Sequence, residues 1–327
     1  MPETPHPENP PEDPGVPQQP GARRGPGEPD GPEPPSRSPR SSRGPDRPST
    51  LADGFRLAVG TLTVFPVRPG TVDRRAGGRA MVLAPLAGAL LGGVAAVVLA
   101  AALRLEVSPL LASALAVGAL ALLTRGLHLD GLADLADGLG SGRPAEQALD
   151  IMKRSDIGPF GVVTLVLTLL VQTAALSEAA SAGIGPPALV AACVAGRLAL
   201  TWACRERVPS ARPGGLGSMV AGTVRRGPAL AATALSLTGV AAVTFVFCLG
   251  TASDLSEPGL STFRSPLVNP FPVVLVLLPA AVAAGLLAAS ALRRRAVRRL
   301  GGITGDVLGA LVETATAAAL VTCAILW

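Results

Sequence analysis

The residues best placed to do chemistry are one histidine and three aspartates in LHLDGLADLADGLG, residues 127–140. If this stretch is helical, Asp130, Asp134 and Asp137 recur at i, i+4 and i+7 and share one face. Three carboxylates on one face repel one another unless a cation lies between them. Mg²⁺ prefers such oxygen ligands and leaves positions open for phosphate oxygens. We therefore expect a magnesium site at these aspartates, whereas His128 by itself is a weak signal.

A plainer interpretation makes this stretch a solvated helix whose aspartates serve as caps or as markers of membrane topology. In that interpretation His128 is a hydrogen-bonded structural residue. The glycines favour the functional interpretation, because they are poor helix formers that let a backbone or a ligand approach closely. These glycines are Gly126, Gly131, Gly138, Gly140 and Gly142.

A second acidic pair lies near the C-terminus, where Asp306 and Glu313 are seven residues apart and so share a helical face. Glu313 falls inside an apolar run, and an ionisable side chain in a membrane span is a candidate functional residue. Gly301, Gly305 and Gly309 recur every four residues. This spacing predicts close helix packing, either within the chain or between copies in a homo-oligomer.

Two arginines could bind an anionic substrate. Arg197 lies within an apolar run, where it needs an acidic side chain or a ligand phosphate as its partner. Arg212 lies in a glycine-rich loop and suits phosphate by charge and reach. Carboxylates for a metal and arginines for phosphate together predict phosphoryl or nucleotidyl transfer.

The elements that must position these residues are membrane helices. The chain has a mean hydropathy of +0.46, with 49% hydrophobic and 16% charged residues. Long apolar runs predict an all-α polytopic membrane protein with about seven transmembrane helices. The predicted spans are 80–104, 108–127, 161–180, 187–204, 229–250, 271–292 and 307–327. Residues 51–70 are predicted to form a short amphipathic or re-entrant segment.

The positions of the charged residues test these predicted spans. The net charge is +5, and almost all of the basic residues are arginine. With seven spans, the basic connections fall on one side of the bilayer. The residues in them are Arg56, Arg68, Arg74, Arg75, Arg79, Arg143, Lys153, Arg154, Arg205, Arg207, Arg212, Arg225, Arg226, Arg293, Arg294, Arg295, Arg298 and Arg299. The positive-inside rule then predicts a multi-pass protein of the cell (inner) membrane with a cytoplasmic N-terminus and active site. The basic charge is thus assigned to the lipid bilayer and not to nucleic acid.

The chain divides into two regions by composition. Residues 1–50 are rich in Pro, Gly, Ser and charged residues, and are predicted to be a disordered cytoplasmic tail. Residues 51–327 are predicted to form a single transmembrane helical catalytic domain.

Four stretches, in this order, resemble the cobalamin synthase family, also called adenosylcobinamide-GDP ribazoletransferases. They are GLHLDGLADLADGLG (126–140), IMKRSDIGPFGV (151–162), ARPGGLGS (211–218) and GGITGDVLGALVE (301–313). The resemblance extends from about residue 55 to the C-terminus, includes LTVFPV (62–67), and leaves residues 1–50 outside. The middle stretch departs from the family pattern, since Arg154-Ser155-Asp156 reverses its usual acid-Ser-base order.

The resemblance implies a Mg²⁺-dependent membrane enzyme that joins adenosylcobinamide-GDP to α-ribazole, or to its 5′-phosphate, and releases GMP. A ribose hydroxyl would attack the phosphorus bonded to cobinamide and displace GMP. The residues matching the acidic motif, one of which would accept the hydroxyl proton, are His128, Asp130, Asp134 and Asp137. The residues implied as substrate or second metal contacts are Arg212, Thr304, Asp306 and Glu313.

Three other interpretations stay open from the residues alone. CDP-alcohol phosphotransferases also use clustered aspartates, but their D-G-x-x-A-R start is matched here only by Asp130-Gly131 and a shifted Ala133. A divalent-cation transporter would carry its acids deep in several helices, whereas the main cluster here lies at a helix end. A purely structural membrane protein leaves the carboxylates at the membrane boundary unexplained.

Overall fold

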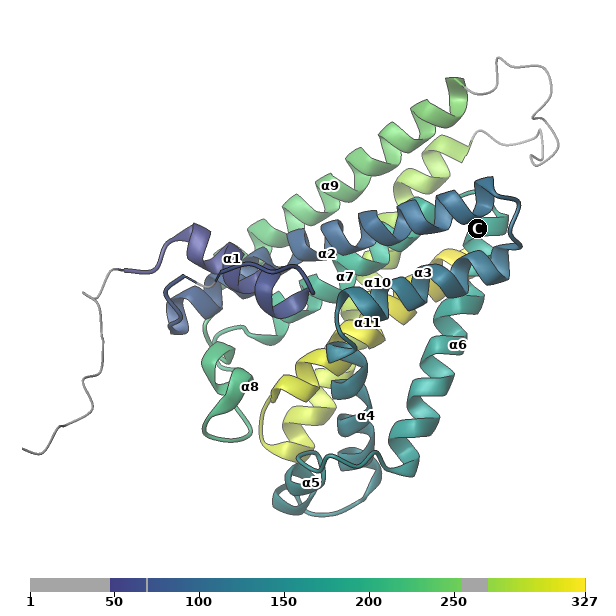
Figure 1. The fold of residues 1–327 in the computed structure, drawn as a ribbon. Helices are drawn as coiled ribbons and strands as arrows, with labels where there is room; N and C mark the ends of the chain where they lie inside the picture. The colour runs from purple at the N-terminus through teal and green to yellow at the C-terminus, as the bar shows by residue number, and fades with distance from the viewer. Residues whose placement is uncertain (1–47, 69, 254–269, 327) are drawn as a thin grey trace, which may run out of the picture. The chain divides into compact units, whose positions relative to one another are not determined.

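The computed structural model describes residues 48–68, 70–253 and 270–326, which fold into helices joined by short connections. The predicted tail lies almost wholly outside the described residues. The helices are α1 (Leu51–Leu62), α2 (Arg74–Arg104), α3 (Pro109–Leu123), α4 (Leu127–Gly140), α5 (Ala145–Ile151), α6 (Pro159–Ser181), α7 (Gly185–Ala203), α8 (Gly215–Val220), α9 (Arg226–Ser253), α10 (Pro270–Leu300) and α11 (Gly305–Leu326) (Figure 1). The described residues contain two isolated parallel bridges and no strand.

Six of these helices are long and apolar enough to cross a membrane, and the count is seven if the bent pair of α3 and α4 is one broken span. The six are α2, α6, α7, α9, α10 and α11, and each coincides with a predicted span. The prediction of an all-α polytopic protein with about seven spans is therefore confirmed.

The span predicted at 108–127 is wrong as a single straight helix. The α3 helix ends at Leu123, and α4 departs from it at an angle of 89°. The 15 residues of α3 span only about 22 Å along the helix axis, which is less than the roughly 30 Å thickness of the hydrocarbon core of a bilayer. The break falls at Arg125 and Gly126, whose φ angles of 54° and 67° are left-handed. The acidic motif thus lies on a separate helix beyond the break.

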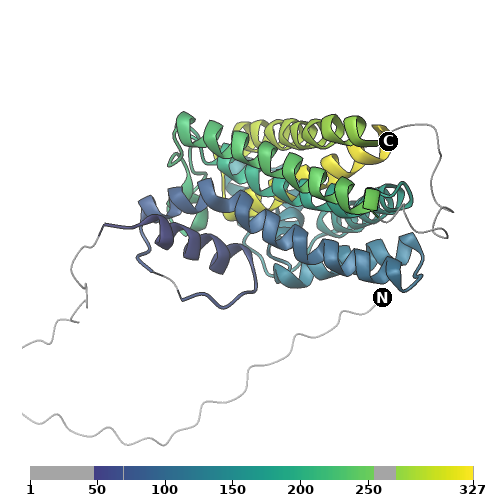
Figure 2. The same cartoon turned by 90° about the horizontal axis from the view of Figure 1, so that it is seen from above.

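The central helix of the bundle is α7, which contacts α2, α6, α9, α10 and α11. Of the most apolar 18-residue stretch of α7, 89% is buried inside the protein, against 22% for the corresponding stretches of α6 and α9. The outer helices α6 and α9 therefore leave most of this apolar surface free to face lipid. Small residues let α2 approach α7 closely, because a Cβ added at Gly88 would lie 2.5 Å from the Cys193 carbonyl oxygen. Figure 2 shows the long helices α2, α9 and α10 running side by side.

The connections rich in arginine lie at one end of this bundle, together with α1, α5 and α8, while the α2–α3 turn and the C-terminal end of α11 lie at the other (Figure 1). The α1 helix begins with a capping box, in which the Thr50 side chain accepts from the Asp53 amide and the Asp53 carboxylate accepts from the Thr50 amide. Its buried residues pack on α2, so the segment predicted at 51–70 forms an amphipathic helix over Leu51–Leu62 only.

Candidate active site

A pocket of about 570 Å³ opens where the four quoted motifs meet, a volume typical of small-molecule sites. Its walls come from α4, the end of α5, the loop before α8 and the start of α11. The charged and polar side chains that line it are His128, Asp130, Lys153, Ser210, Arg212, Thr304 and Asp306. Five of the eight predicted site residues therefore line one pocket.

Two glycine-rich loops, about ninety residues apart in the chain, are hydrogen-bonded to each other at this pocket. The Ala211 amide donates to the Ile303 carbonyl at 3.0 Å, and the Ile303 amide donates to the Pro209 carbonyl at 2.9 Å. Gly302 is required at this crossing, because a Cβ there would lie 2.4 Å from the Ala211 nitrogen. The pairing holds Arg212 beside the start of α11.

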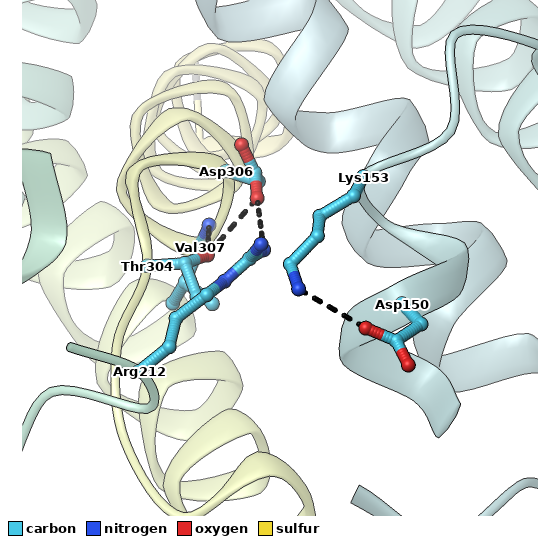
Figure 3. A network of polar contacts seen from close by, with 6 residues as sticks. All are labelled: Asp150, Lys153, Arg212, Thr304, Asp306 and Val307. Carbon is cyan, nitrogen blue, oxygen red and sulfur yellow. Dashed lines mark hydrogen bonds and ion pairs between the residues drawn. The ribbon is translucent and has the colours of Figure 1, made fainter. Parts of the chain in front are cut away.

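Arg212 and Asp306 form the ion pair of the pocket, with 3.3 Å between the arginine Nη2 and the carboxylate Oδ2 (Figure 3). Thr304 donates to the same oxygen at 3.2 Å and also accepts from the Val307 amide at 3.2 Å. The Thr304 hydroxyl therefore caps α11 and orients Asp306. Since a guanidinium has five N–H donors, Arg212 keeps donors free for a ligand in the pocket.

Lys153 is a pocket residue that the sequence analysis left out of the site. It is the only lysine of the chain, and its exposed ammonium lies 3.0 Å from the Asp150 carboxylate. Figure 3 shows its side chain reaching toward Arg212 across the same space. Its position within the motif 151–162 was the available signal.

Asp130 and Asp134 lie one turn apart on α4. Asp130 is exposed and lines the pocket, and Asp134 is partly buried beside it, close enough for Asp130 and Asp306 to act on its charge. Within the described residues, no three His, Cys, Asp or Glu side chains converge as a complete metal site. Mg²⁺ rarely needs such a cage, because it is commonly held by one or two carboxylates, water and substrate phosphates. The oxygen donors of Asp130 and Asp134 fit that pattern.

Asp137, the third predicted metal ligand, points elsewhere. Its buried carboxylate accepts from the Gly158 amide at 2.8 Å and from the Gly161 amide at 2.9 Å, at the start of α6. The α6 helix has no side-chain cap of its own, so Asp137 caps it from α4. A Cβ at Gly158 or Gly161 would lie 2.4 Å from a carboxylate oxygen, which explains both glycines of the motif.

Glu313 does not line the pocket either. It faces a separate cavity of about 20 Å³, a space for about one water molecule and far too small for a substrate. There its carboxylate accepts from the Gln172 amide group at 2.8 Å. Arg197 lines the same cavity, so its surroundings are protein side chains and not the large pocket.

The glycines of α4 and α11 bring their helices together. A Cβ at Gly131 would lie 2.8 Å from the Asp306 carbonyl oxygen, and one at Gly309 would lie 3.1 Å from the His128 carbonyl oxygen. Gly131 therefore faces a neighbouring backbone and not a ligand. The predicted packing face holds at Gly309, whereas Gly301 lies before α11 begins, with a φ of 82°.

The chain matches one known protein family over most of its length. Residues 54–324 match the family model of cobalamin-5-phosphate synthase. The chain belongs to this family. It is 42% identical over 274 residues to an adenosylcobinamide-GDP ribazoletransferase of Frankia casuarinae, covering 81% of this chain and 92% of the relative. A protein of the same name from a Nocardioides species is 40% identical over 273 residues, covering 83% and 97%. No solved structure matches the chain.

The three residues that depart from the family pattern, Arg154, Ser155 and Asp156, follow Lys153 in the chain and do not line the pocket. Arg154 and Asp156 are both exposed, in the connection between α5 and α6, and neither contributes to the pocket wall. Within the described residues of this cobalamin-5-phosphate synthase family member, they form no ion pair with each other.

Proposed function

We propose that this chain transfers adenosylcobinamide phosphate from adenosylcobinamide-GDP to α-ribazole, or to its 5′-phosphate, and releases GMP. The observation that carries the proposal is the pocket itself, whose lining includes the carboxylates Asp130 and Asp306 and the cations Arg212 and Lys153, all from the quoted motifs. Family membership and the printed activity of the relatives support it. The phosphotransferase and transporter alternatives are not favoured by either.

The cations have a direct role in this reaction. A ribose hydroxyl attacks the phosphorus bonded to cobinamide, the bond from that phosphorus to the GMP oxygen breaks, and negative charge develops on the leaving phosphate. Arg212 and Lys153 lie where they can bind the two phosphates of the substrate and stabilise that charge. Asp306 holds Arg212 in place through their ion pair.

Asp130 and Asp134 are the residues that we propose hold Mg²⁺. When bound, the ion neutralises phosphate oxygens and favours departure of GMP. The two carboxylates are otherwise like charges one turn apart, close to Asp306, and a cation between them removes this repulsion. We leave Asp137 out of this proposed site, because its carboxylate caps the start of α6 and does not line the pocket.

The apolar side of the pocket suits the second substrate. Met81, Met152 and Leu200 are among the apolar residues that line it. The aromatic base of a ribazole is flat and apolar, and methionine side chains adapt well to such surfaces. We place the base against these residues, with its ribose directed to the charged side.

We also propose the orientation in the inner membrane. The pocket lies at the end of the bundle where the arginine-rich connections gather. The positive-inside rule assigns that end, and therefore the active site, to the cytoplasm.

The test is an assay of purified protein in liposomes with adenosylcobinamide-GDP, α-ribazole and Mg²⁺. We expect GMP and a ribazole-containing corrinoid to form in equal amounts, and EDTA to stop both. Folded protein that forms neither product, but releases CMP from a CDP-alcohol, would overturn the proposal.

A further inference from the structure

A chain of buried polar side chains runs from the pocket into the membrane interior. His128 on α4, Arg197 on α7 and Gln172 on α6 are each no more than 3% exposed. Gln172 in turn donates to Glu313 on α11, which shares the small cavity with Arg197. Four helices thus meet in one polar cluster, and of its members only His128 reaches the large pocket.

The contact between His128 and Arg197 has a defined direction. The Arg197 Nη2 lies 3.4 Å from the His128 Nδ1. A guanidinium can only donate, so Nδ1 must accept, and the ring is neutral with its hydrogen on Nε2. The assignment follows from the chemistry of arginine, which has no acceptor to offer.

The other ring nitrogen is not open to the pocket. Among the described residues, His128 Nε2 is fully buried and has no hydrogen-bond partner. A proton acceptor must come within hydrogen-bond reach of the proton that it takes. Neither nitrogen meets this condition, because Nδ1 faces Arg197 and Nε2 is enclosed and carries the hydrogen.

We propose that His128 is a positioning residue, held by Arg197, and does not accept the proton of the attacking hydroxyl. The hydrogen bond fixes α4 against α7, and the close approach of Gly309 to the His128 carbonyl fixes it against α11. These two contacts set the register of the carboxylates of Asp130 and Asp134, which follow within two turns. The role of those carboxylates rests on the proposed function, whereas the His128–Arg197 hydrogen bond does not.

The hydrogen bond can be tested without any substrate. The chain has only two histidines, so a His6→Ala variant labelled with ¹⁵N-histidine gives the ring signals of His128 alone. In nanodiscs we expect an unprotonated Nδ1 and a protonated Nε2, and we expect this tautomer to lose its dominance in Arg197→Gln. A ring protonated at Nδ1, or at both nitrogens, would overturn the inference whether or not the proposed reaction occurs.

Kinetics separate positioning from proton transfer. Asparagine can present its carbonyl oxygen at the place of Nδ1, whereas glutamine reaches the place of Nε2 and leaves Arg197 without an acceptor. We expect His128→Asn to retain at least about tenfold more kcat than His128→Gln, since misplacement of about 1 Å can lower a rate by about 100-fold. Adding Arg197→Gln to His128→Gln should lower kcat little further, because both remove one interaction.

A proton acceptor would give the opposite pattern. His128→Asn and His128→Gln would then lose activity alike, by roughly 10²- to 10⁴-fold, and Arg197→Gln would add its own full loss. That result, in variants whose melting temperature in detergent matches the wild type, would overturn the positioning role.

Discussion

Balance between opposite charges explains why carboxylates and cationic side chains lie together at the pocket. Asp130, Asp134 and Asp306 would repel one another in an empty pocket, and Arg212 compensates only one of them directly. In the proposed function, a cation and a bound diphosphate would complete the balance, with carboxylates on the metal and Arg212 with Lys153 on the phosphates. We therefore expect the substrate to be charged and to supply part of the ligand set of the proposed metal.

Replacing either proposed metal ligand should remove activity without unfolding the protein. We expect Asp130→Asn and Asp134→Asn each to lower kcat by at least about 100-fold, because electrostatic stabilisation of this kind typically contributes about 10²–10³ in rate. GMP release measures the effect. Glu146→Gln is the matched control, since Glu146 is exposed on nearby α5 and lies outside the pocket. Normal turnover in both aspartate variants would exclude them as metal ligands.

Arg212 should act mainly on the phosphates. We expect Arg212→Gln to lower kcat/KM for adenosylcobinamide-GDP by about 10- to 100-fold, because a hydrogen bond to a charged group contributes about 1.5–3 kcal/mol. Arg212→Lys should recover only part of this, since an ammonium cannot bind phosphate in a bidentate manner. Arg225→Gln serves as the control, because that arginine is exposed and pairs with Glu206 away from the pocket. Equal losses in the two glutamine variants would contradict a specific role.

At the scale of elements, the junction between α4 and α6 depends on Asp137. Its carboxylate closes the start of α6, where the backbone amides have no other side-chain partner. The glycines at 158 and 161 let the carboxylate approach that backbone. In the acidic motif, Asp137 thus has a structural contact, while Asp130 and Asp134 are the residues proposed to act in the chemistry.

This division predicts a stability effect for Asp137. We expect Asp137→Asn to lower the free energy of unfolding by about 1–3 kcal/mol, because it weakens hydrogen bonds to a buried charged group. The concentration of Mg²⁺ needed for half-maximal activity should stay unchanged. Gly161→Ala should destabilise similarly, whereas Gly93→Ala, where a Cβ meets nothing within 4 Å, should not. Thermal melts in detergent and a Mg²⁺ titration check both points, and a Mg²⁺ requirement raised severalfold in Asp137→Asn would restore Asp137 to the metal site.

The sequence predicted the helices well because long apolar runs leave few alternatives in a bilayer. It could not show the break at Arg125, since only Gly126 among these residues favours a left-handed backbone. Nor could helical spacing show the depth of Glu313. Asp306 and Glu313 do share a face, but seven residues separate them by about 10 Å along the axis. One therefore lies in the pocket and the other in the membrane interior.

The hydrogen-bond partners of Asp137 could not be predicted from helical spacing, for a different reason. The contact joins residues 21 and 24 positions apart, across a helix and a loop. Spacing along one helix identifies side chains on one face, but it does not say which neighbouring element lies opposite. The family resemblance added the motifs and the reaction, and the structure then separated pocket residues from packing residues within each motif.

Across the bundle of six spans, or seven if α3 and α4 form one, the elements that line the pocket lie at the same end as the arginine-rich connections (Figure 1). The orientation can be tested in cells with single cysteines in a background without the four native ones. We expect Glu146→Cys, in α5, to react with a membrane-impermeant maleimide only after permeabilisation. Glu106→Cys, in the α2–α3 turn, should react in intact cells whose outer surface is accessible. The reverse pattern would place the active site outside the cytoplasm.

The central claim to test is that adenosylcobinamide phosphate is transferred at the pocket that contains Asp130. The most direct measurement compares wild type and Asp130→Asn, both in liposomes, for corrinoid product and GMP formed from adenosylcobinamide-GDP and α-ribazole. We predict equimolar products from the wild type with Mg²⁺, and less than about one hundredth of that rate from the variant. A folded wild type that forms no ribazole-containing corrinoid, or a variant as active as the wild type, would contradict the account.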